Sequence, residues 1–313
     1  PEILEKLHHA REAAKKEKRE LANYAIKIIM NSFYGVLASQ NSRFFNFDMA
    51  SSITNFAQMI IKLTAEEIEK KGYRIIYSDT DSVFVLSNLS KDKALQLGKE
   101  LETYINTLYQ ELVQKKYNRH SYLELEFEKL YLSLMFPQVR QQKKDEGEAK
   151  AAKKRYAGLL EKNGEEVLEV VGLEAIRGDW TDAAQEFQRE LLTKAFHGEP
   201  IEAYIKEYIK KIRAGKMNEL LIYRKSIRKG LDEYTKTTPP HVKAARLLDS
   251  LDSNVIEYYI TEAGPEPKQK LTHKLDYDHY ITKQIEPIAN QILTILNKKF
   301  SDIAQNSGQA TLF

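Results

Sequence analysis

The first part of the chain has a helical period of apolar and polar positions. From residue 3 to about residue 34 the pattern predicts a long, highly charged helical segment, broken once, with Gly35 as its stop. Residues 8–20 are the most polar part, and Arg11 lies there among other cations and glutamates. A solvated helix with ion pairs four residues apart explains that part as well as a binding function does.

Near the end of this segment, three polar or aromatic side chains share one side of the predicted helix. Lys27, Asn31 and Tyr34 are spaced by four and three residues, so they project in similar directions. The other side is apolar, with Ile26, Ile29, Met30 and Phe33. A cation, an amide and an aromatic ring on one stripe are suited to a triphosphate, a sugar edge and a base face.

The next helix is predicted from Asp48, as its cap, to Lys71, with Gly72 ending it. Its apolar positions fit a stripe facing the core: Ile53, Phe56, Ile60, Ile61, Leu63 and Ile68. A further amphipathic helix is expected over residues 91–116.

Between these two helices, residues 73–86 contain two short apolar runs around the sequence Ser-Asp-Thr-Asp. Both runs are rich in Ile, Val, Phe and Tyr, so we predict a β-hairpin with Asp79 and Asp81 at its turn. Paired carboxylates of this kind suit Mg²⁺, which takes one or two of them together with substrate phosphates. Asp and Ser also favour turns for conformational reasons, and for an isolated Asp-x-Asp this is the commoner explanation.

Residues 122–132 alternate between apolar positions and glutamates, which predicts a half-exposed strand. Glu126 and Glu128 then lie on its solvent face, where an auxiliary metal contact is the less favoured interpretation. Residues 138–154 are poor in apolar residues and predict a loop or charged helical turn. Asn163-Gly164 predicts a type I′ hairpin between strands at 155–160 and 166–171.

Cations stand beside an aromatic residue where this hairpin begins. Lys153, Lys154, Arg155 and Tyr156 combine phosphate-binding charge with a ring that can pack on a sugar or base edge. By itself the cluster fits the solvated start of a strand equally well.

From residue 179 to about residue 255 the period is helical, with one helix opening at Thr181 and another at Pro200. This is the most basic part of the chain, carrying Lys206, Lys210, Lys211, Arg213, Lys216, Arg224, Lys225, Arg228 and Lys229. Such a helical, basic domain suits contact with a nucleic-acid backbone, whereas scattered lysines for solubility are the alternative. Beyond it we expect a short helix at 242–251, a strand at 255–260, a turn at 264–267 and a helix at 278–300 kinked by Pro287.

Composition restricts the class of protein. The chain has 313 residues, of which 42% are hydrophobic and 30% charged, as in a globular rather than a disordered protein. It has no cysteine, which excludes disulfides, thiolate metal sites and a cysteine nucleophile. No apolar run approaches the roughly 20 residues of a membrane span, and we find no signal peptide, so we expect a cytoplasmic protein without a membrane partner. Because the first residue is Pro1, we also expect the chain to begin inside a longer protein.

Two motifs resemble those of family B DNA polymerases. Lys27 to Gly35 is similar to the family's K-x-x-x-N-S-x-Y-G motif, and Tyr77 to Ser82 to its Y-x-D-T-D-S motif, in the same order. Further segments resemble one branch of the family, the bacterial DNA polymerase II type. The further matches are His9-Ala-Arg-Glu-Ala, Arg43-Phe-Phe, Ala50-Ser-Ser-Ile-Thr, Lys153-Lys-Arg-Tyr-Ala-Gly-Leu, Tyr223-Arg-Lys, Pro239-Pro-His-Val-Lys-Ala-Ala-Arg-Leu, Gly264-Pro-Glu-Pro and Leu275-Asp-Tyr-Asp-His-Tyr.

The resemblance implies an α+β fold: a palm with an antiparallel sheet and backing helices, preceded by fingers helices and followed by a mainly helical thumb. The implied domains are residues 1–35 for the fingers, 36–178 for the palm with the catalytic hairpin, and 179–313 for the thumb and a terminal tail. The chain would be the carboxyl-terminal half of such an enzyme.

The resemblance also implies roles for the candidate residues. Asp81 is the main metal ligand and Asp79 the supporting one, for two Mg²⁺ ions in the complete enzyme. Lys27, Asn31, Tyr34 and Arg11 bind the incoming dNTP. Lys153, Lys154, Arg155 and Tyr156 contact the primer-template DNA. The ending, with Gln309, Leu312 and Phe313, resembles the peptide by which bacterial polymerases bind the sliding clamp.

One part of the expected active site is missing. The family takes another aspartate from a motif upstream of the fingers, and no D-x-x-S-L-Y-like segment occurs in this chain. We therefore expect the isolated chain to be inactive and to need the amino-terminal half of the polymerase as a partner. The alternatives are a small subunit of a split polymerase and a non-catalytic module that binds DNA and the clamp.

Overall fold

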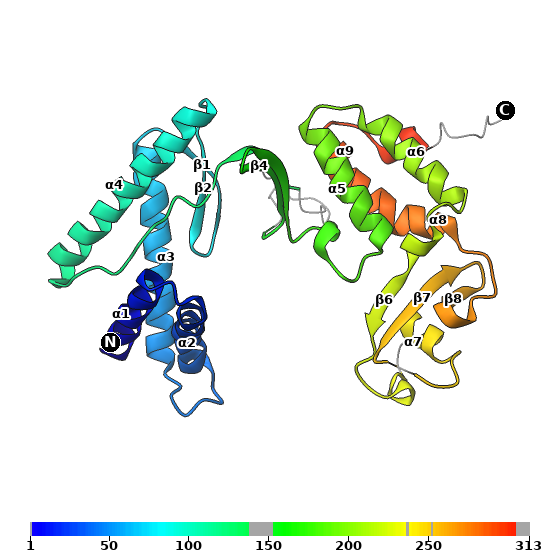
Figure 1. The fold of residues 1–313 in the computed structure, drawn as a ribbon, viewed down its shortest axis with the longest axis horizontal. Coiled ribbons are helices and arrows are strands. Elements are labelled where there is room, and N and C mark those ends of the chain that lie inside the picture. The colour runs from blue at the N-terminus through cyan, green and yellow to red at the C-terminus, as the bar shows by residue number, and fades with distance from the viewer. Residues whose placement is uncertain (1, 138–152, 236–237, 252, 305–313) are drawn as a thin grey trace. The chain divides into compact units, whose positions relative to one another are not determined.

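The computed structural model describes residues 2–137, 153–235, 238–251 and 253–304. The chain divides into two compact units, Pro1–Phe127 and Glu128–Phe313, and each is described by itself (Figure 1). This division is one of packing, and the functional boundaries at residues 35 and 178 stay a prediction. Mixed helices and antiparallel sheets confirm the predicted α+β class.

The first unit opens with two packed helices, α1 (Glu2–Lys16) and α2 (Glu20–Ala38). The predicted single break lies between them, where Lys18 has a φ of 54°. Gly35, however, does not end the helix, which continues to Ala38. A glycine stops a helix where it adopts a positive φ, and Gly35 keeps a helical conformation, its carbonyl accepting a hydrogen bond from the Ser39 N–H at 3.1 Å.

Helix α3 (Phe47–Lys70) joins the other elements of this unit, because it packs against α2, against both strands of a hairpin and against α4 (Lys91–Tyr117). Its cap is Asn46, whose side chain accepts from the Met49 N–H at 2.9 Å, so the predicted cap at Asp48 was wrong by two positions. The carboxy-terminal half of α3 contributes Ile68 to a core with Leu97, Leu101, Ile105 and Tyr109 of α4.

The first half of α3 differs from the prediction. Ile53 and Phe56 were expected in the core, yet they are 42% and 47% exposed within the described residues. Of the predicted stripe, Ile60, Ile61 and Leu63 are half-buried and Ile68 is fully buried, so burial increases along α3 towards its packing with α4 and the hairpin.

The segment after α4 was predicted as a strand over residues 122–132, which is wrong for most of its length. Its backbone bonds to side chains of α4 instead. The Leu125 N–H donates to Asn106 Oδ1 at 2.8 Å, and Asn106 Nδ2 donates to the Leu125 carbonyl at 2.9 Å. The Phe127 N–H donates to Glu102 Oε2 at 2.7 Å, and its ring lies where a Cβ on Gly98 would be. The apolar alternation thus reflects packing of an extended segment on a helix.

The second unit begins with an antiparallel sheet in the order β3 (Tyr131–Met135), β4 (Tyr156–Lys162) and β5 (Glu165–Val171). Lys162 pairs with Glu165, which leaves Asn163 and Gly164 as the turn residues, with φ of 55° and 84°. Both positive values fit the predicted type I′ hairpin.

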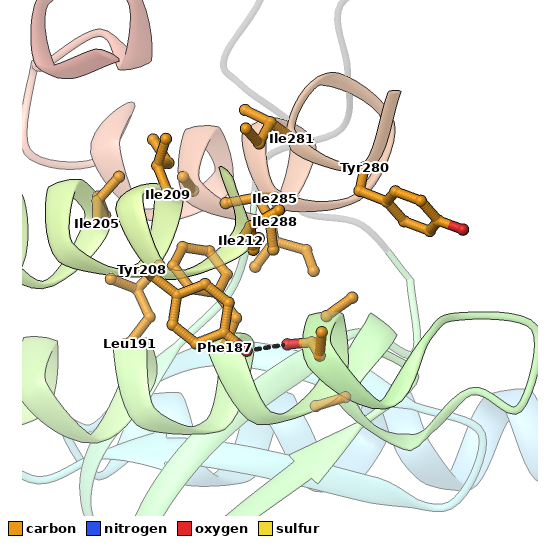
Figure 2. Packing of buried hydrophobic residues seen from close by; sticks show 14 of the residues in the cluster. Phe187, Leu191, Ile205, Tyr208, Ile209, Ile212, Tyr280, Ile281, Ile285 and Ile288 are labelled. Atoms are coloured by element: carbon orange, nitrogen blue, oxygen red, sulfur yellow. Dashed lines mark hydrogen bonds between the residues drawn. The ribbon is translucent and has the colours of Figure 1, made fainter. Parts of the chain in front are cut away.

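Helices follow this sheet and enclose the largest core of the second unit (Figure 2). They are η1 (Glu174–Ile176), α5 (Asp182–Phe196), α6 (Ile201–Arg213), η2 (Asn218–Leu221), α8 (Tyr277–Tyr280), the π-helix η5 (Ile281–Ile285), α9 (Glu286–Leu293) and α10 (Phe300–Ala304). Thr181 caps α5 and Pro200 precedes α6, as predicted. The predicted helix at 278–300 is interrupted: a π-turn precedes Pro287 and the helix ends at Leu293, so residues 294–299 link it to α10.

Figure 2 shows how Phe187 and Leu191 of α5 meet Ile205, Tyr208 and Ile212 of α6 in this core. Tyr208 keeps its hydroxyl satisfied by donating to the Ala183 carbonyl at 2.7 Å. A buried aromatic can therefore fill the core without leaving a polar atom unpaired.

A third small sheet completes the second unit, in the order β6 (Tyr223–Ser226), β7 (Val255–Thr261) and β8 (Gly264–Pro267), with η3 (Leu231–Glu233), α7 (Pro240–Ala245) and η4 (Lys268–Lys270). Strand β7 confirms the strand expected at 255–260. The turn expected at 264–267 is strand β8, and the short helix expected at 242–251 is α7, which ends at Ala245. No described helix is long and apolar enough to cross a membrane.

A buried carboxylate of β8 organises the loop that follows the strand. Glu266 is 6% exposed and accepts hydrogen bonds from the N–H groups of Thr272, at 2.7 Å, and His273, at 3.2 Å. The Thr272 hydroxyl and the His273 ring also bond to it. Burial raises the pKa of this carboxyl, but these hydrogen bonds outweigh burial and lower the pKa to about 2.

We expect Glu266→Gln to lower the free energy of unfolding by about 1–3 kcal/mol at neutral pH, since a buried charged acceptor is lost. Because the pKa is lowered in the folded state, the wild-type advantage is complete above the usual carboxyl pKa of 4.5 and is lost as the pH falls towards about 2. Denaturant unfolding of both proteins across this pH range measures the difference in free energy of unfolding. Glu262→Gln, at a neighbouring exposed carboxylate, is the matched control and should change little. Equal effects of the two changes would contradict the assignment.

Candidate active site

The predicted hairpin with two aspartates is present as β1 (Arg74–Asp79) and β2 (Ser82–Leu86), paired antiparallel. Asp79 pairs with Ser82, so Thr80 and Asp81 form a two-residue turn. One irregularity interrupts the register: Ile75 pairs with Val85 and Tyr77 pairs with Phe84, which leaves Ile76 as the extra residue of a β-bulge.

The bulge decides which way Asp79 faces. Ile75, Val83 and Val85 pack on the core formed by α3 and α4. Residues of β2 alternate, so Phe84 and Ser82 lie on the opposite face, and their partners Tyr77 and Asp79 lie there with them. The Tyr77 and Phe84 rings are 5.4 Å apart on that face. Without the extra residue, a regular alternation from Ile75 would turn Asp79 towards the helices.

The turn itself is tightly bonded. The Asp81 N–H donates to the Asp79 carbonyl at 2.7 Å, and Ser82 Oγ donates to the same carbonyl at 3.2 Å. Thr80 has a φ of 56° and donates from Oγ1 to Asp79 Oδ1 at 3.1 Å. Asp81 is exposed and Asp79 is half-buried. A threonine in the left-handed region is costly, so the turn is held in this shape by the surrounding hydrogen bonds.

Two carboxylates at an exposed turn fit Mg²⁺ chemistry, which uses oxygen ligands and keeps room for substrate phosphates and water. Within the described residues, no group of three or more His, Asp or Glu side chains is arranged to hold a metal ion. The hairpin therefore supplies two ligands and leaves the remainder of the coordination to other groups.

The stripe predicted on α2 is exposed. Lys27, Asn31 and Tyr34 all face solvent, and Tyr34 is 43% exposed. On the other side, Ile26, Met30 and Phe33 are half-buried, whereas Ile29, expected with them, is 48% exposed. Since no residue of α2 is fully buried, the helix presents most of its surface outward.

Arg11 reaches from α1 to α2, where its Nε donates to Asn23 Oδ1 at 3.1 Å. Its side chain is half-buried and ties the two helices together. A direct nucleotide contact by Arg11 stays a prediction.

Helix α3 connects the α1–α2 helix pair with the hairpin. It packs on α2 and on both hairpin strands, all within the first unit. The short connection after α3 makes β1 return alongside it, and in Figure 1 the hairpin turn points towards the end of α3 where α1 and α2 lie. Both candidate groups thus belong to one folded unit.

The DNA-contact candidates lie in the second unit, at the start of β4. Tyr156 is half-buried, with the rings of Tyr131 at 6.3 Å and Phe136 at 6.0 Å. Lys154 has a φ of 56°, and Arg155 forms an ion pair with Glu174. The clamp candidates Gln309, Leu312 and Phe313 lie outside the described residues.

Sequence reasoning missed Glu174. It is 4% exposed and accepts from Gln188 Nε2 at 2.9 Å and Gln291 Nε2 at 3.0 Å, in addition to Arg155. Burial raises its pKa, but these donors outweigh burial and leave the pKa below the usual value. The available signal in the sequence was a carboxylate between two apolar residues, Leu173 and Ala175, which the structure shows to be fully buried.

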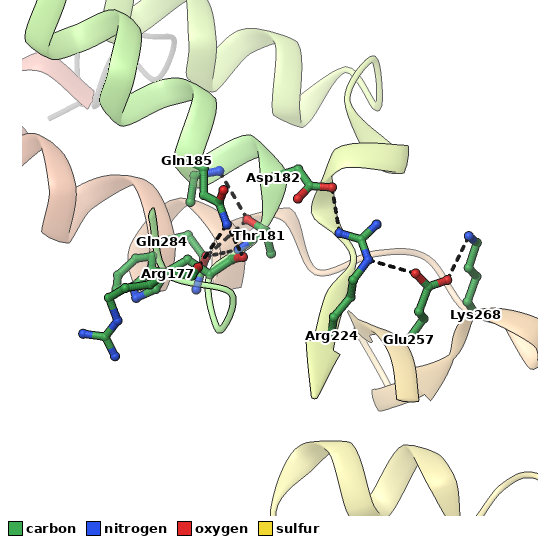
Figure 3. Close-up of polar contacts among 10 residues, drawn as sticks. Arg177, Thr181, Asp182, Gln185, Arg224, Glu257, Lys268 and Gln284 are labelled. Carbon is green, nitrogen blue, oxygen red and sulfur yellow. Dashed lines mark hydrogen bonds and ion pairs between the residues drawn. The ribbon is translucent and has the colours of Figure 1, made fainter. Parts of the chain in front are cut away.

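A second polar network connects α5 with the third sheet (Figure 3). Arg224 donates to Asp182 at 2.8 Å and to Glu257 at 2.9 Å, and Lys268 donates to Glu257 at 3.0 Å. The predicted basic stretch is therefore partly neutralised: Arg224 is paired here, Lys211 pairs with Glu207, and Arg213 pairs with Asp278.

Comparison with known proteins gives consistent matches along the chain. The sequence model of DNA polymerase family B matches residues 2–306. The chain is 39% identical over 326 aligned residues to DNA polymerase II of Escherichia coli, covering all of this chain and 40% of that protein. It is 29% identical to a DNA polymerase of Desulfurococcus, covering all of this chain and 41% of that protein.

Among solved structures, the chain is similar to the family B DNA polymerase of the archaeon Pyrobaculum calidifontis. The TM-score is 0.62 at 27% sequence identity, over 93% of this chain and 37% of that one. The chain thus spans about two fifths of the length of these relatives.

The strained turn gives a test of the hairpin geometry. We expect Thr80→Asn to stabilise the hairpin by roughly 1 kcal/mol, because asparagine tolerates the left-handed conformation better than a β-branched residue. Slower hydrogen exchange of the Asp81 N–H would show it. The reverse change, Asn118→Thr, at a residue with a φ of 51° that caps α4, should speed local exchange. Faster exchange in Thr80→Asn would refute this account of the turn.

Proposed function

The chain belongs to DNA polymerase family B, and we propose that it contributes the catalytic hairpin, the nucleotide-binding helix and the thumb of a polymerase II-like enzyme. The implied reaction is template-directed DNA synthesis, in which a primer 3′-hydroxyl attacks the α-phosphate of a dNTP and releases pyrophosphate. The observation that carries this proposal is the pair of aspartates at an exposed turn, turned away from the core by a bulge, in the same unit as the exposed stripe of α2.

The metal chemistry fits the donors at this turn. Asp81 would be the main ligand of Mg²⁺ and Asp79 the supporting one, since both are oxygen donors on the same tight turn. When bound, two Mg²⁺ ions lower the pKa of the attacking hydroxyl and stabilise charge on the leaving oxygens. Because the described residues offer no third acidic group there, we propose that the amino-terminal half of the polymerase supplies another aspartate.

The stripe of α2 would hold the incoming nucleotide. Lys27 would meet the triphosphate, since a flexible ammonium group binds phosphate as a point charge. Asn31, one turn further, would hold the nucleotide region, and Tyr34 would pack at the nascent base pair. Arg11 would be a second cation that meets the phosphates of the nucleotide, held beside α2 by its bond to Asn23.

The second unit would bind the primer-template. Lys153, Lys154 and Tyr156 at β4, together with the basic helices, supply backbone contacts that do not read sequence. Arg155 belongs to the same predicted group. Such binding is electrostatic and weakens with salt, because each neutralised phosphate releases counterions.

The last residues would give the enzyme its link to replication or repair of DNA in the bacterial cytoplasm and nucleoid. Gln309, Leu312 and Phe313 combine a polar anchor with two adjacent apolar ones, which suits a hydrophobic pocket on a sliding clamp. A tethered contact of modest affinity raises the local concentration of the enzyme at the primer.

Primer extension with Mg²⁺ tests the catalytic proposal. We expect no synthesis by this chain alone, synthesis when it is mixed with the amino-terminal half, and a loss of at least roughly a hundred-fold in the mixture with Asp81→Asn, because a metal ligand is weakened. Duplex binding should be unchanged in this variant. Asp92→Asn, an exposed aspartate in the first turn of α4, is the control. Absence of synthesis from a folded and associated mixture would favour a non-catalytic module that binds DNA and the clamp.

Deletion of residues 309–313 tests the clamp proposal. Clamp affinity measured by surface plasmon resonance should fall by at least roughly ten-fold, because the apolar anchors are lost. Extension by the completed enzyme without a clamp should stay the same. Replacing Gln305 and Asn306 by alanine, just before the tail, is the control. Unchanged clamp affinity after the deletion would refute a clamp-binding role.

A further inference from the structure

The segment that carries Lys154 and Tyr156 is attached to the connection between β5 and α5 in the second unit. The attachment is made by Arg155, which lies between these two residues and forms an ion pair with Glu174. Glu174 belongs to η1, in the connection between β5 and α5. The start of β4 is therefore joined, through one side chain, to the segment that leads into the helices.

The carboxylate of Glu174 is buried and has a donor on each side. Its Oε1 accepts from Arg155, and its Oε2 accepts from Gln188 of α5 and Gln291 of α9. The network extends further, because Gln188 Oε1 accepts from the Ala175 N–H and Arg189 donates to the Ala175 carbonyl at 3.1 Å. Side chains of α5 and α9 thus fix the Glu174 carboxylate, and this carboxylate in turn fixes Arg155.

The guanidinium group of Arg155 takes part in this network. Its Nε is buried and has no hydrogen-bond partner among the described residues, while its terminal nitrogen bonds to Glu174. A cation that served mainly to bind a phosphate would gain from exposure, where its whole fork of donors can reach the ligand. Here one nitrogen of the fork, Nη2, bonds to a buried carboxylate that neutralises the charge, and the side chain as a whole is 32% exposed.

The backbone on either side is fixed as well. Lys154 has a φ of 56°, and its carbonyl oxygen occupies the place that a Cβ on residue 172 would need. Gly172 has a φ of 64°, so its lack of a side chain permits both its own conformation and the close approach. Two consecutive residues, 154 and 155, are thus packed against residues 172–174.

From this geometry we propose that Arg155 and Glu174 are positioning residues, which set the direction in which Lys154 and Tyr156 meet the primer-template. Arg155 acts through its neighbours and does not bind phosphate itself. This inference rests on the proposed function and assigns, within the predicted group of contacts, different roles to Arg155 and to the residues beside it.

The change Glu174→Gln separates positioning from direct contact, because the two roles predict effects of opposite sign. If Arg155 bound phosphate, removing a competing carboxylate would free it and remove a negative charge, so DNA would bind as tightly or more tightly. As a positioning residue, Arg155 loses its anchor, and affinity for a primer-template should fall roughly ten-fold. Fluorescence anisotropy with this chain and a labelled primer-template measures the change. Glu190→Gln, an exposed carboxylate on α5, is the matched control and should not weaken binding.

A coupling measurement excludes a merely structural effect. If Glu174 acts through Lys154, then Glu174→Gln should weaken binding much less in a Lys154→Ala background than in the wild type. Independent, additive losses would overturn the proposal. So would unchanged or tighter binding by Glu174→Gln when the wild-type chain binds DNA.

If thermal unfolding shows that the Glu174→Gln variant is not folded, the Arg155→Lys variant is measured instead. Lysine keeps the charge but not the fork, so a positioning role predicts a loss as large as in Arg155→Met. Retention of most of the affinity would indicate a phosphate contact and overturn the inference. A folded wild-type chain that binds no primer-template would instead refute DNA binding itself, and the positioning role with it.

Discussion

The candidate site depends on the burial of one face of a two-stranded hairpin. A hairpin of this size is at best marginally stable in water, so its shape must come from what it packs against. Ile75, Val83 and Val85 cover the core formed by α3 and α4. The opposite face and the turn are then available for polar groups, and the bulge at Ile76 directs Asp79 to them. A hydrophobic contact on one side of the hairpin thereby determines where the carboxylates on the other side lie.

In the second unit, two buried carboxylates fix the positions of loops and strand ends. Glu174 joins the start of β4 to α5 and α9, and Glu266 closes the loop after β8. Each is nearly inaccessible to solvent and satisfied by several donors, which is the condition under which a buried charge is tolerated. Removal of a single donor would leave a buried anion incompletely paired. These networks therefore define loop geometry more sharply than apolar contacts alone, which tolerate small displacements.

Much of the fold followed from local patterns in the sequence. The hairpin of Asp79 and Asp81, the turn at Asn163-Gly164 and the capping of α5 by Thr181 all have short-range causes, and all were predicted. The errors arose where a distant partner decides the outcome. Residues 122–130 alternate like a strand but bond to side chains of α4, and among the described residues Ile53 and Phe56 in the first half of α3 stay largely exposed. Likewise, the bulge and the burial of Glu174 depend on pairing and packing that no local pattern encodes.

The position of the two aspartates at an exposed turn has an energetic consequence if, as proposed, another segment completes the site. Two carboxylates on a solvent-facing turn repel each other weakly, because water screens them. Bringing a third carboxylate to the same place, as the proposed function requires, adds repulsion and removes water. A bound cation would offset that cost, so metal binding and closure of the site would be thermodynamically linked. The shape of the hairpin, by contrast, depends on the apolar face that α3 and α4 cover, which lies opposite the face of Asp79.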